Sequence, residues 1–586
     1  MLCITCSIVW PHHASLAQAP PPGIPQAMAA LQRGDPQRGV QILEESVKRE
    51  PKNVRAWRAL GFVAIKAGKY DRALEAYSTA LKIEPNYPPA LYNVGVAHAL
   101  KKEPDAAFEW LRKAKATHKV DMAQIEVDAD LLALKSDPRF KALLPTPEEF
   151  RYPFVEPVKI LREWDGEATN DQFGWIARSM GDVDGDGIID VVTSAPTKAI
   201  GEANAGRVYV YSSRTGKLLW KVDGKPGDML GLGVECAGDV NRDGVPDVIA
   251  GAPGAGKCYV YSGKDGRVLL TLTAENVADA FGRHVAGVGD IDGDGYADVM
   301  VGAPGNSAGG PGAGRAYVYS GKDGHVLLTL TGENPVDAFG STVAGYSDQH
   351  HHFLIVGAPG GGMKHAGATY VYDGPGNLSN GHSDAVRDAS PGIGGRGAKS
   401  QSGPTPKFVI QSDETGSALG NMFVSVVGDL DGDGVPDIYA TDFANSANGP
   451  GSGRAYVRSG ADGHPLLTLT GETAGEGFGI GRADAGDVNH DGHADLVIGS
   501  WQFAGAAISG GKVTVFSGKD GSKLRTITGK ILGETLGFDA VGIGDVDGDG
   551  IPDLLITSAW SGIHGYHSGR IYIISTGRLG RLPSAK

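Results

Sequence analysis

Residues 281–304 read FGRHVAGVGDIDGDGYADVMVGAP, and this stretch decides the fold because its landmarks recur along the chain. The landmarks are Phe281-Gly282, an aspartate-rich loop that begins at Asp290, and Gly302-Ala-Pro304. As the first landmark of the repeat, a Phe-Gly or Leu-Gly pair stands at seven positions 51 to 80 residues apart, beginning at Phe173, Leu230, Phe281, Phe339, Leu419, Phe478 and Leu536. Self-similarity of this kind indicates a repeat architecture, in which each unit packs against its neighbours.

Each unit carries the pattern of four short strands. The run Cys258-Tyr-Val-Tyr261 alternates with a period of two, which is typical of a half-buried strand. Asp265-Gly266 follows and predicts a type I′ hairpin, in which both central residues have positive φ. A last strand, Val268–Leu272, ends the unit. Seven four-stranded units predict an all-β seven-bladed propeller over residues 155–577.

The two ends of this repeat region complement one another. Arg570–Ile574 has no fourth strand after it, and Lys159–Arg162 precedes the first Phe-Gly pair without a unit of its own. We therefore expect these segments to pair in one blade and close the ring. The 80-residue interval contains an insertion, about residues 374–405, rich in Gly, Ser and Pro. It predicts a surface loop, which either carries function or is a simple excursion of the chain.

Residues 25–145 have a different composition and predict a small all-α domain. Glycine becomes rare there, and Ala, Leu, Glu and Lys recur at helical spacing. The pattern of the 34-residue tetratricopeptide (TPR) repeat is matched by Trp57, Leu60, Gly61, Ala64, Ala73, Tyr77, Ala80 and Pro85. Related copies precede and follow this window. Such helix pairs either dock a partner or act as a spacer, and the sequence leaves both roles open.

Six of the seven propeller units contain the loop Asp-x-Asp/Asn-x-Asp-Gly-x-x-Asp. Its carboxylate and amide side chains predict metal ligands, with the backbone carbonyl of the seventh loop residue as a further ligand. The six sets are Asp182, Asp184, Asp186, Ile188 and Asp190; Asp239, Asn241, Asp243, Val245 and Asp247; Asp290, Asp292, Asp294, Tyr296 and Asp298; Asp429, Asp431, Asp433, Val435 and Asp437; Asp487, Asn489, Asp491, His493 and Asp495; Asp545, Asp547, Asp549, Ile551 and Asp553.

The chemistry of these loops favours calcium, with about six structural sites. Ca²⁺ takes 6–8 oxygen ligands, and alternating carboxylates on a tight loop converge on one point. Mg²⁺ prefers a small octahedral shell that retains water, and Zn²⁺ prefers His and Cys. The fourth unit differs, because its loop is three residues shorter, retains Asp348 and places Phe353 where the last aspartate is expected. We expect no calcium in that unit.

The composition and the N-terminus bear on location and partners. The net charge of −14 argues against nucleic acid, whose phosphates recruit basic surfaces. Residues 1–19 combine an apolar run with Ala17-Gln18-Ala19, which predicts a signal peptide and export to the periplasm, the cell surface or the medium. No later stretch is apolar for long enough to cross a membrane. Cys236 and Cys258 lie on the first and third strands of one unit and are expected to remain unbridged.

Phe-Gly, Gly-Ala-Pro and the aspartate-rich loop together resemble the FG-GAP repeats of integrin α-subunits and of glycosylphosphatidylinositol-specific phospholipase D. The resemblance covers about residues 155–577. It implies a seven-bladed propeller with calcium loops on one face and ligand contacts on the other, and adhesion or binding rather than catalysis. The TPR-like front end is foreign to integrins, and the zinc cluster of the phospholipase has no counterpart, since residues 25–150 contain only His98 and His118 as histidines.

The sequence thus favours an exported calcium-binding propeller that engages a protein or glycan partner. No set of residues in the sequence supports a catalytic assignment. Two alternatives stay open: a propeller-based enzyme that processes polysaccharide or lipid with acids or histidines in its central channel, and a structural envelope scaffold. An enzyme would present an acid–base pair at the channel mouth, whereas a binder would present aromatic and arginine side chains on the face opposite calcium. The oligomeric state is open.

Overall fold

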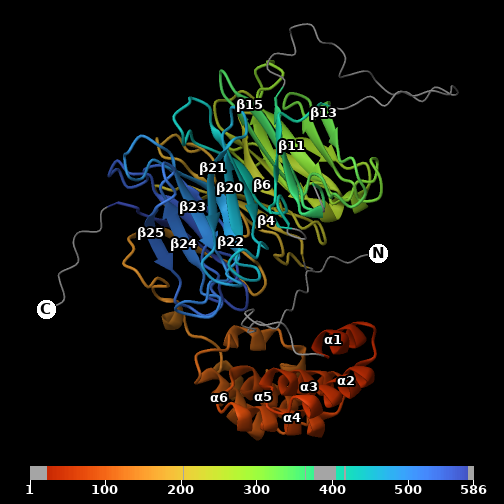
Figure 1. Ribbon diagram of the computed structural model, residues 1–586. Coiled ribbons are helices and arrows are strands. Elements are labelled where there is room, and N and C mark those ends of the chain that lie inside the picture. The colour runs from red at the N-terminus through yellow and green to blue at the C-terminus, as the bar shows by residue number, and fades with distance from the viewer. Residues whose placement is uncertain (1–22, 202–203, 363–364, 375–403, 415–417, 578–586) are drawn as a thin grey trace, which may run out of the picture. The chain divides into compact units, whose positions relative to one another are not determined.

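The computed structural model describes residues 23–201, 204–362, 365–374, 404–414 and 418–577 (Figure 1). The predicted signal peptide and nearly all of the predicted insertion lie outside the described residues. The chain divides into two compact units. The first is helical and extends to Tyr152, with Ile531–Gly533 added to it, and the second comprises Pro153–Lys530 and the chain from Glu534 onward.

Three helix pairs build the first unit, as the repeat pattern predicts. They are α1 (Ile24–Gln32), α2 (Pro36–Arg49), α3 (Val54–Lys66), α4 (Tyr70–Ile83), α5 (Pro88–Leu100) and α6 (Pro104–Lys115). Short elements follow, namely η1 (Met122–Glu126), η2 (Ala129–Leu134), α7 (Pro138–Lys141) and η3 (Pro147–Phe150). Proline stands in the first turn of α2, α5 and α6, where its missing N–H has no helical acceptor in any case.

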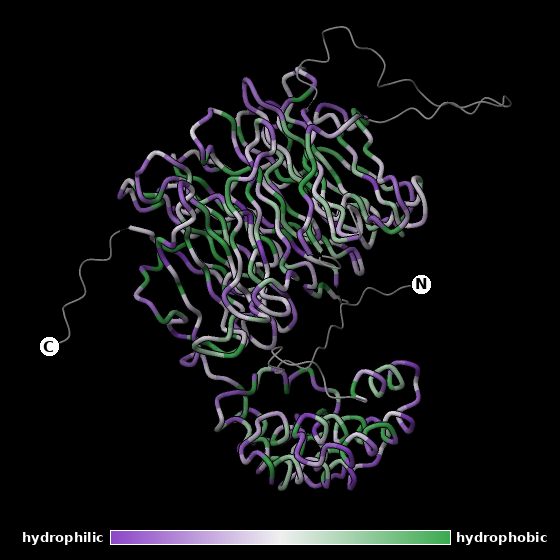
Figure 2. Tube along the Cα trace, viewed as in Figure 1, coloured by the Kyte–Doolittle hydropathy of each residue, from purple (hydrophilic) through white to green (hydrophobic). Residues whose placement is uncertain are grey.

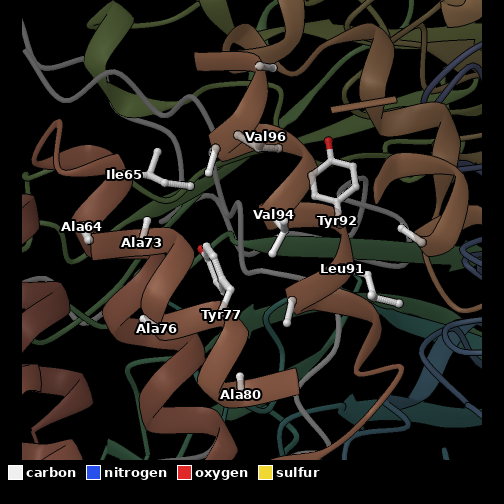
Figure 3. Packing of buried hydrophobic residues seen from close by; sticks show 14 of the residues in the cluster. Ala64, Ile65, Ala73, Ala76, Tyr77, Ala80, Leu91, Tyr92, Val94 and Val96 are labelled. Carbon is white, nitrogen blue, oxygen red and sulfur yellow. The ribbon is translucent and has the colours of Figure 1, made fainter. Parts of the chain in front are cut away.

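Small residues let the paired helices approach closely. A Cβ atom on Gly61 of α3 would lie 2.6 Å from the ring of Tyr77 on α4, and one on Gly95 of α5 would lie 2.8 Å from Leu111 on α6. Tyr77 is fully buried among alanines of α3 and α4 (Figure 3). The small residues of the repeat pattern therefore stand at these close helix contacts, which a larger side chain would prevent.

Seven four-stranded antiparallel sheets build the second unit. In blades 1 to 6, strands one to four follow the chain order. Blade 1 comprises β2 (Ala177–Ser179), β3 (Val191–Ala195), β4 (Arg207–Tyr211) and β5 (Leu218–Asp223); blade 2 comprises β6 (Val234–Gly238), β7 (Asp247–Ala252), β8 (Lys257–Tyr261) and β9 (Val268–Thr273); blade 3 comprises β10 (Val285–Gly289), β11 (Asp298–Ala303), β12 (Arg315–Tyr319) and β13 (Val326–Thr331).

The next three blades repeat this order. Blade 4 comprises β14 (Thr342–Ser347), β15 (His352–Ala358), β16 (Ala368–Asp373) and β17 (Phe408–Gln411); blade 5 comprises β18 (Val424–Val427), β19 (Asp437–Asp442), β20 (Arg454–Arg458) and β21 (Pro465–Thr470); blade 6 comprises β22 (Phe478–Gly486), β23 (Asp495–Ser500), β24 (Lys512–Phe516) and β25 (Lys523–Thr528).

Blade 7 joins strands from both ends of the unit, as predicted. Its chain order is β26 (Ala540–Gly542), β27 (Leu554–Ser558) and β28 (Arg570–Ile574), and the outer strand is β1 (Ile160–Asp165). Trp164 of β1 pairs with Ile571 of β28, and Asp165 pairs with Arg570. First strands of neighbouring blades contact one another around the axis, including β2 with β26. The seven-bladed architecture is therefore closed.

The core lies between the blades. The second strands are apolar and almost wholly buried, because a neighbouring blade covers each of their faces. Between blades 1 and 2, for example, Val192 and Val210 pack with Val234 and Val248. Figure 2 shows hydrophobic residues along the blade interiors and hydrophilic residues in many of the connecting loops.

The predicted type I′ hairpins between the third and fourth strands are wrong. Gly266 has φ +72°, but Asp265 is not among the residues with positive φ, and the same holds for the three other Asp-Gly pairs at 323–324, 462–463 and 520–521. Gly266 N–H donates to the carbonyl of Ser262, four residues back, and the register shifts at Val260–Tyr261. A four-residue loop with a β-bulge needs only the glycine in the left-handed region.

Candidate metal centres

The six aspartate-rich loops occupy one position in the fold. Each connects the first and second strands of its blade, for example between β10 and β11. Since strands in a blade alternate in direction, these loops share one face with the connections between third and fourth strands. The connections between second and third strands, and those between blades, lie on the opposite face.

The first aspartate of each loop organises the backbone around itself. In blade 1, Asp182 Oδ1 accepts hydrogen bonds from the N–H groups of Gly185 and Asp186 at 2.7 and 3.0 Å, and Oδ2 accepts from Gly187 at 2.8 Å. Gly185 and Gly187 have φ +80° and +85°, which other residues rarely adopt. The loop is thus folded tightly enough to bring Asp182 and Asp184 together with the buried Asp190, whereas Asp186 is not part of this group.

The last aspartate of each loop is buried and fixes the loop to the blade. Asp298 Oδ2 accepts from Ile291 N–H at 2.9 Å, and Oδ1 accepts from Gly321 N–H at 2.9 Å. In four other loops the N–H groups of the same two backbone positions donate to the last aspartate, namely Asp190, Asp247, Asp437 and Asp495. In the remaining loop, Asp553 accepts from the N–H groups of Val546 and Thr576.

Burial also changes the acidity of these last aspartates. It raises the pKa of the carboxyl groups of Asp190, Asp247, Asp298 and Asp553 to about 6 and that of Asp437 to about 7. The ionised form is disfavoured because little water reaches it and other carboxylates lie near. A cation at this position would compensate the charge.

Four of the six loops bring three carboxylates together with their ligand oxygens within 4.8 Å of one another. The groups are Asp182, Asp184 and Asp190; Asp290, Asp292 and Asp294; Asp429, Asp431 and Asp433; Asp545, Asp547 and Asp549. The chemistry of this donor set fits a hard divalent cation, which prefers several oxygen ligands on a flexible loop. The predicted ligands that would complete each set come from the same loop.

The loops of blades 2 and 6 differ because asparagine replaces the second aspartate. The Asn241 amide donates to Asp247 Oδ1 and Oδ2 at 3.3 Å each, and the Asn489 amide donates to Asp491 Oδ2 at 3.2 Å. Their first aspartates still accept from the loop backbone, as Asp239 does from Gly244 N–H at 2.9 Å. These loops have the same fold with one negative charge fewer.

Basic side chains approach several of the loops from the same face. Arg214 Nε lies 3.2 Å from Asp186 Oδ2, and Lys159 Nζ lies 2.7 Å from Asp547 Oδ2. Hydrogen bonding to Lys159 lowers the pKa of the Asp547 carboxyl group. These groups offset part of the charge that each loop concentrates.

The fourth blade has a short turn at this position. Asp348 Oδ1 accepts from the N–H groups of His350 and His351, at 2.6 Å each, and these bonds hold the pKa of Asp348 well below its usual range. Phe353 lies in β15, paired with Tyr346. The position of the last aspartate is thus occupied by a buried ring.

Charged residues that the sequence did not single out line the central channel. Arg178 of β2 binds Asp539, and its Nε lies 3.1 Å from Glu235 Oε2 of β6. Arg482 Nη2 of β22 lies 2.5 Å from the same Glu235 oxygen. The sequence feature that could have pointed to these residues is a charged side chain within the innermost strand of a blade. The two guanidinium and two carboxylate groups of this channel cluster therefore compensate one another's charge.

His284 lies beside this cluster. Burial, and secondarily the neighbouring arginines, lowers the pKa of its imidazole to about 3. Its Nδ1 lies 3.4 Å from Thr342 Oγ1. The ring is therefore neutral near physiological pH.

Cys236 and Cys258 are both free, as predicted. Within the part of the chain that the structure describes, no helix is both long and apolar enough to span a bilayer.

Comparison with known proteins agrees with both units. The tetratricopeptide repeat model matches residues 24–88 and 60–119. The FG-GAP repeat model matches residues 234–270, 281–319 and 538–574, and an FG-GAP-like repeat model matches residues 182–250.

Relatives include integrin α chains. The chain is 32% identical over 173 residues to integrin alpha-PS5 of Drosophila melanogaster, covering 26% of this chain and 17% of the relative. It is 34% identical over 154 residues to integrin alpha-6 of Gallus gallus, covering 24% and 14%, and 31% identical over 216 residues to integrin alpha pat-2 of Caenorhabditis briggsae, covering 31% and 17%. The match thus spans less than a fifth of each relative. This chain carries tetratricopeptide repeats followed by a seven-bladed FG-GAP propeller similar to that of integrin α chains.

Proposed function

We propose that this protein is an exported binding module whose propeller is stabilised by calcium at the six aspartate-rich loops. The observation that carries the proposal is one loop fold at one place in six blades, with carboxylates gathered at four of them. Six to eight oxygen ligands suit Ca²⁺, and affinities of about 0.1–1 mM are usual for extracellular modules. The predicted signal peptide supports export to a compartment where calcium is plentiful.

The partner is a protein or a glycan, held on the face opposite the metal loops. Similarity to integrin α chains supports a binding or adhesion role over catalysis. The compensated charges of the channel cluster support the same choice, because an acid–base pair in the channel is what the enzyme alternative needs.

Calcium titration of the chelator-treated protein tests the proposal. Isothermal calorimetry should show several sites, and Asp290→Ala should remove one of them while Asp348→Ala, in the fourth-blade turn, leaves the number unchanged. A protein that binds no calcium, or whose melting temperature is the same with and without chelator, would rule the proposal out.

A further inference from the structure

Aromatic side chains gather on one arc of the face opposite the metal loops. They come from blades 6, 7 and 1, and we call them the aromatic patch: Trp175, Trp501, Phe538, Trp560, Tyr566 and His567. Their ring centroids form a continuous series. Trp175 lies 4.9 Å from Phe538, Phe538 lies 5.7 Å from Trp501, and Trp501 lies 4.9 Å from Trp560. His567 stacks on Trp560 at 4.9 Å, with an angle of 13° between the ring planes.

The propeller fold itself does not require these aromatic residues. At the position that follows the second strand, blades 1 to 4 carry Pro196, Pro253, Pro304 and Pro359, whereas blade 6 carries Trp501. In blade 7, Trp560 comes one residue later. The residue after each Phe-Gly or Leu-Gly pair also varies, being Trp175 in blade 1 but Ser341 in blade 4. Since blades 1 to 4 fold with proline at the first position and blade 4 folds with serine at the second, a blade does not need tryptophan at either.

The patch is both accessible and held in place. Trp175, Trp501 and Trp560 are only half-buried, and Phe538 lies beneath them with 4% of its surface exposed. The loop that carries Tyr566 and His567 is fixed by backbone hydrogen bonds, because Asn170 N–H donates to the Tyr566 carbonyl at 2.7 Å and Gln172 N–H donates to the His567 carbonyl at 2.9 Å. A rigid aromatic surface loses little conformational entropy when a partner binds.

The surroundings of the patch are nearly neutral. Two acids near it are buried and already bonded: Glu534 accepts from Ser561 Oγ and Tyr572 Oη at 2.9 Å each, and Glu476 accepts from the N–H groups of Glu472 and Thr473 at 3.0 Å each. Half-buried amides flank the rings at Gln172 and Gln502. Arg283, in blade 3, is the one charged residue of the channel-mouth cavity that Trp175 and Phe538 also line, and His284 beside it is neutral.

This combination selects the partner by its chemistry. Aromatic faces carry partial negative charge and attract the C–H groups of a sugar ring, while amide side chains exchange hydrogen bonds with hydroxyl groups. A charged ligand would gain little here, because the acids are already paired. We infer that the aromatic patch binds a neutral glycan, whose sugar rings stack on Trp501 and Trp560. This inference rests on the proposed binding function and names the class of its partner.

The test uses the full mature chain in calcium buffer and an array of neutral oligosaccharides that includes cellohexaose, chitohexaose, mannohexaose and xylohexaose. The wild type should bind at least one of them and shift its tryptophan fluorescence. Trp501→Ala and Trp560→Ala should each weaken that binding about tenfold, the usual scale of a lost stacking contact. Phe443→Ala is the matched control, since Phe443 is the aromatic residue at the equivalent position of blade 5 and lies outside the patch; its affinity should be unchanged.

The outcomes separate this inference from the proposed function. If the wild type binds calcium but no neutral glycan, or if both tryptophan variants bind as tightly as the wild type, the glycan inference is wrong and the calcium-stabilised module stands. Concentration-dependent dimers that Trp501→Ala abolishes would instead make the patch a contact between copies. If calcium has no effect on the wild-type melting temperature, the proposed function itself fails, whatever the array shows.

Discussion

Ile160, in the first strand of the propeller, pairs with Ile574 in the last. The pairing joins residues more than 400 positions apart and makes blade 7 from both ends of the unit. Every other blade is continuous in the chain, so this is the one sheet in which strands from the two ends of the unit close the ring.

Removal of residues 155–166 should therefore lower the melting temperature of the propeller markedly. The deletion removes β1 from the edge of β28. It thereby exposes Ile571 and Ile573, which pack with Trp164 in the intact blade. Differential scanning calorimetry measures the change. Val155→Ser is a suitable control, because Val155 is 51% exposed and should be nearly neutral. An unchanged melt of the deletion protein would contradict closure by β1.

The calcium affinity of each metal loop should rise with the number of carboxylates in that loop. Asn241→Asp adds a carboxylate to the blade 2 loop and should tighten that site about tenfold, since ligand charge sets affinity in such loops. Asp239→Asn in the same loop should weaken it by a similar factor. Calorimetric titration resolves the change, and identical curves for the three proteins would show that this loop holds no calcium.

The buried last aspartate should matter for the fold as well as for metal binding. Asp298→Ala leaves the N–H groups of Ile291 and Gly321 without their acceptor, and each loss costs about 1–3 kcal/mol. Urea unfolding in the presence of chelator isolates this effect from calcium. Asp292 lies in the same loop but does not accept from these two N–H groups, so Asp292→Ala should cost less under those conditions. Equal losses for the two variants would contradict the anchoring role of Asp298.

Glu235 should be the most sensitive residue of the channel cluster. Glu235→Gln keeps the side-chain shape but leaves Arg482 without its carboxylate, and because this arginine side chain is 20% exposed the cost should be below the about 3–5 kcal/mol of a fully buried unpaired charge. The exposed Lys113–Glu109 pair on α6 provides the comparison, because solvent screens it and Glu109→Gln should change the free energy of unfolding little. Chemical denaturation measures both. A small effect of Glu235→Gln would mean that the guanidinium groups find other partners.

His284 should make stability depend on pH on the acid side. Its pKa is about 3 in the folded protein and about 6.5 when unfolded. Between these values the unfolded state binds more protons, so stability falls as the pH drops below 6.5, by at most about 1.4 kcal/mol per pH unit. His284→Gln should flatten this part of the profile, whereas His118→Gln, at an exposed site of the helical unit, should not. Parallel profiles for wild type and His284→Gln would disprove the contribution.

The sequence predicted features that repeat and missed features that arise between repeats. The blades, their closure and the loop that begins at Asp290 followed from landmarks that each unit carries by itself. Arg178 and Glu235 meet only because blades 1 and 2 are neighbours around the axis, and Trp501 meets Trp560 across another blade boundary. The type I′ turns were wrong because the Asp-Gly pair alone does not report the β-bulge beside it.

The channel cluster also joins blades that are far apart in the chain. Side chains from blades 1, 2, 6 and 7 meet at the axis through Arg178, Glu235, Arg482 and Asp539. Glu235 of blade 2 pairs both with Arg178 of the neighbouring blade 1 and with Arg482 of blade 6, which does not adjoin blade 2 in the ring. The loss of this one carboxylate therefore removes a link between two blades that share no boundary as well as a link between two neighbours.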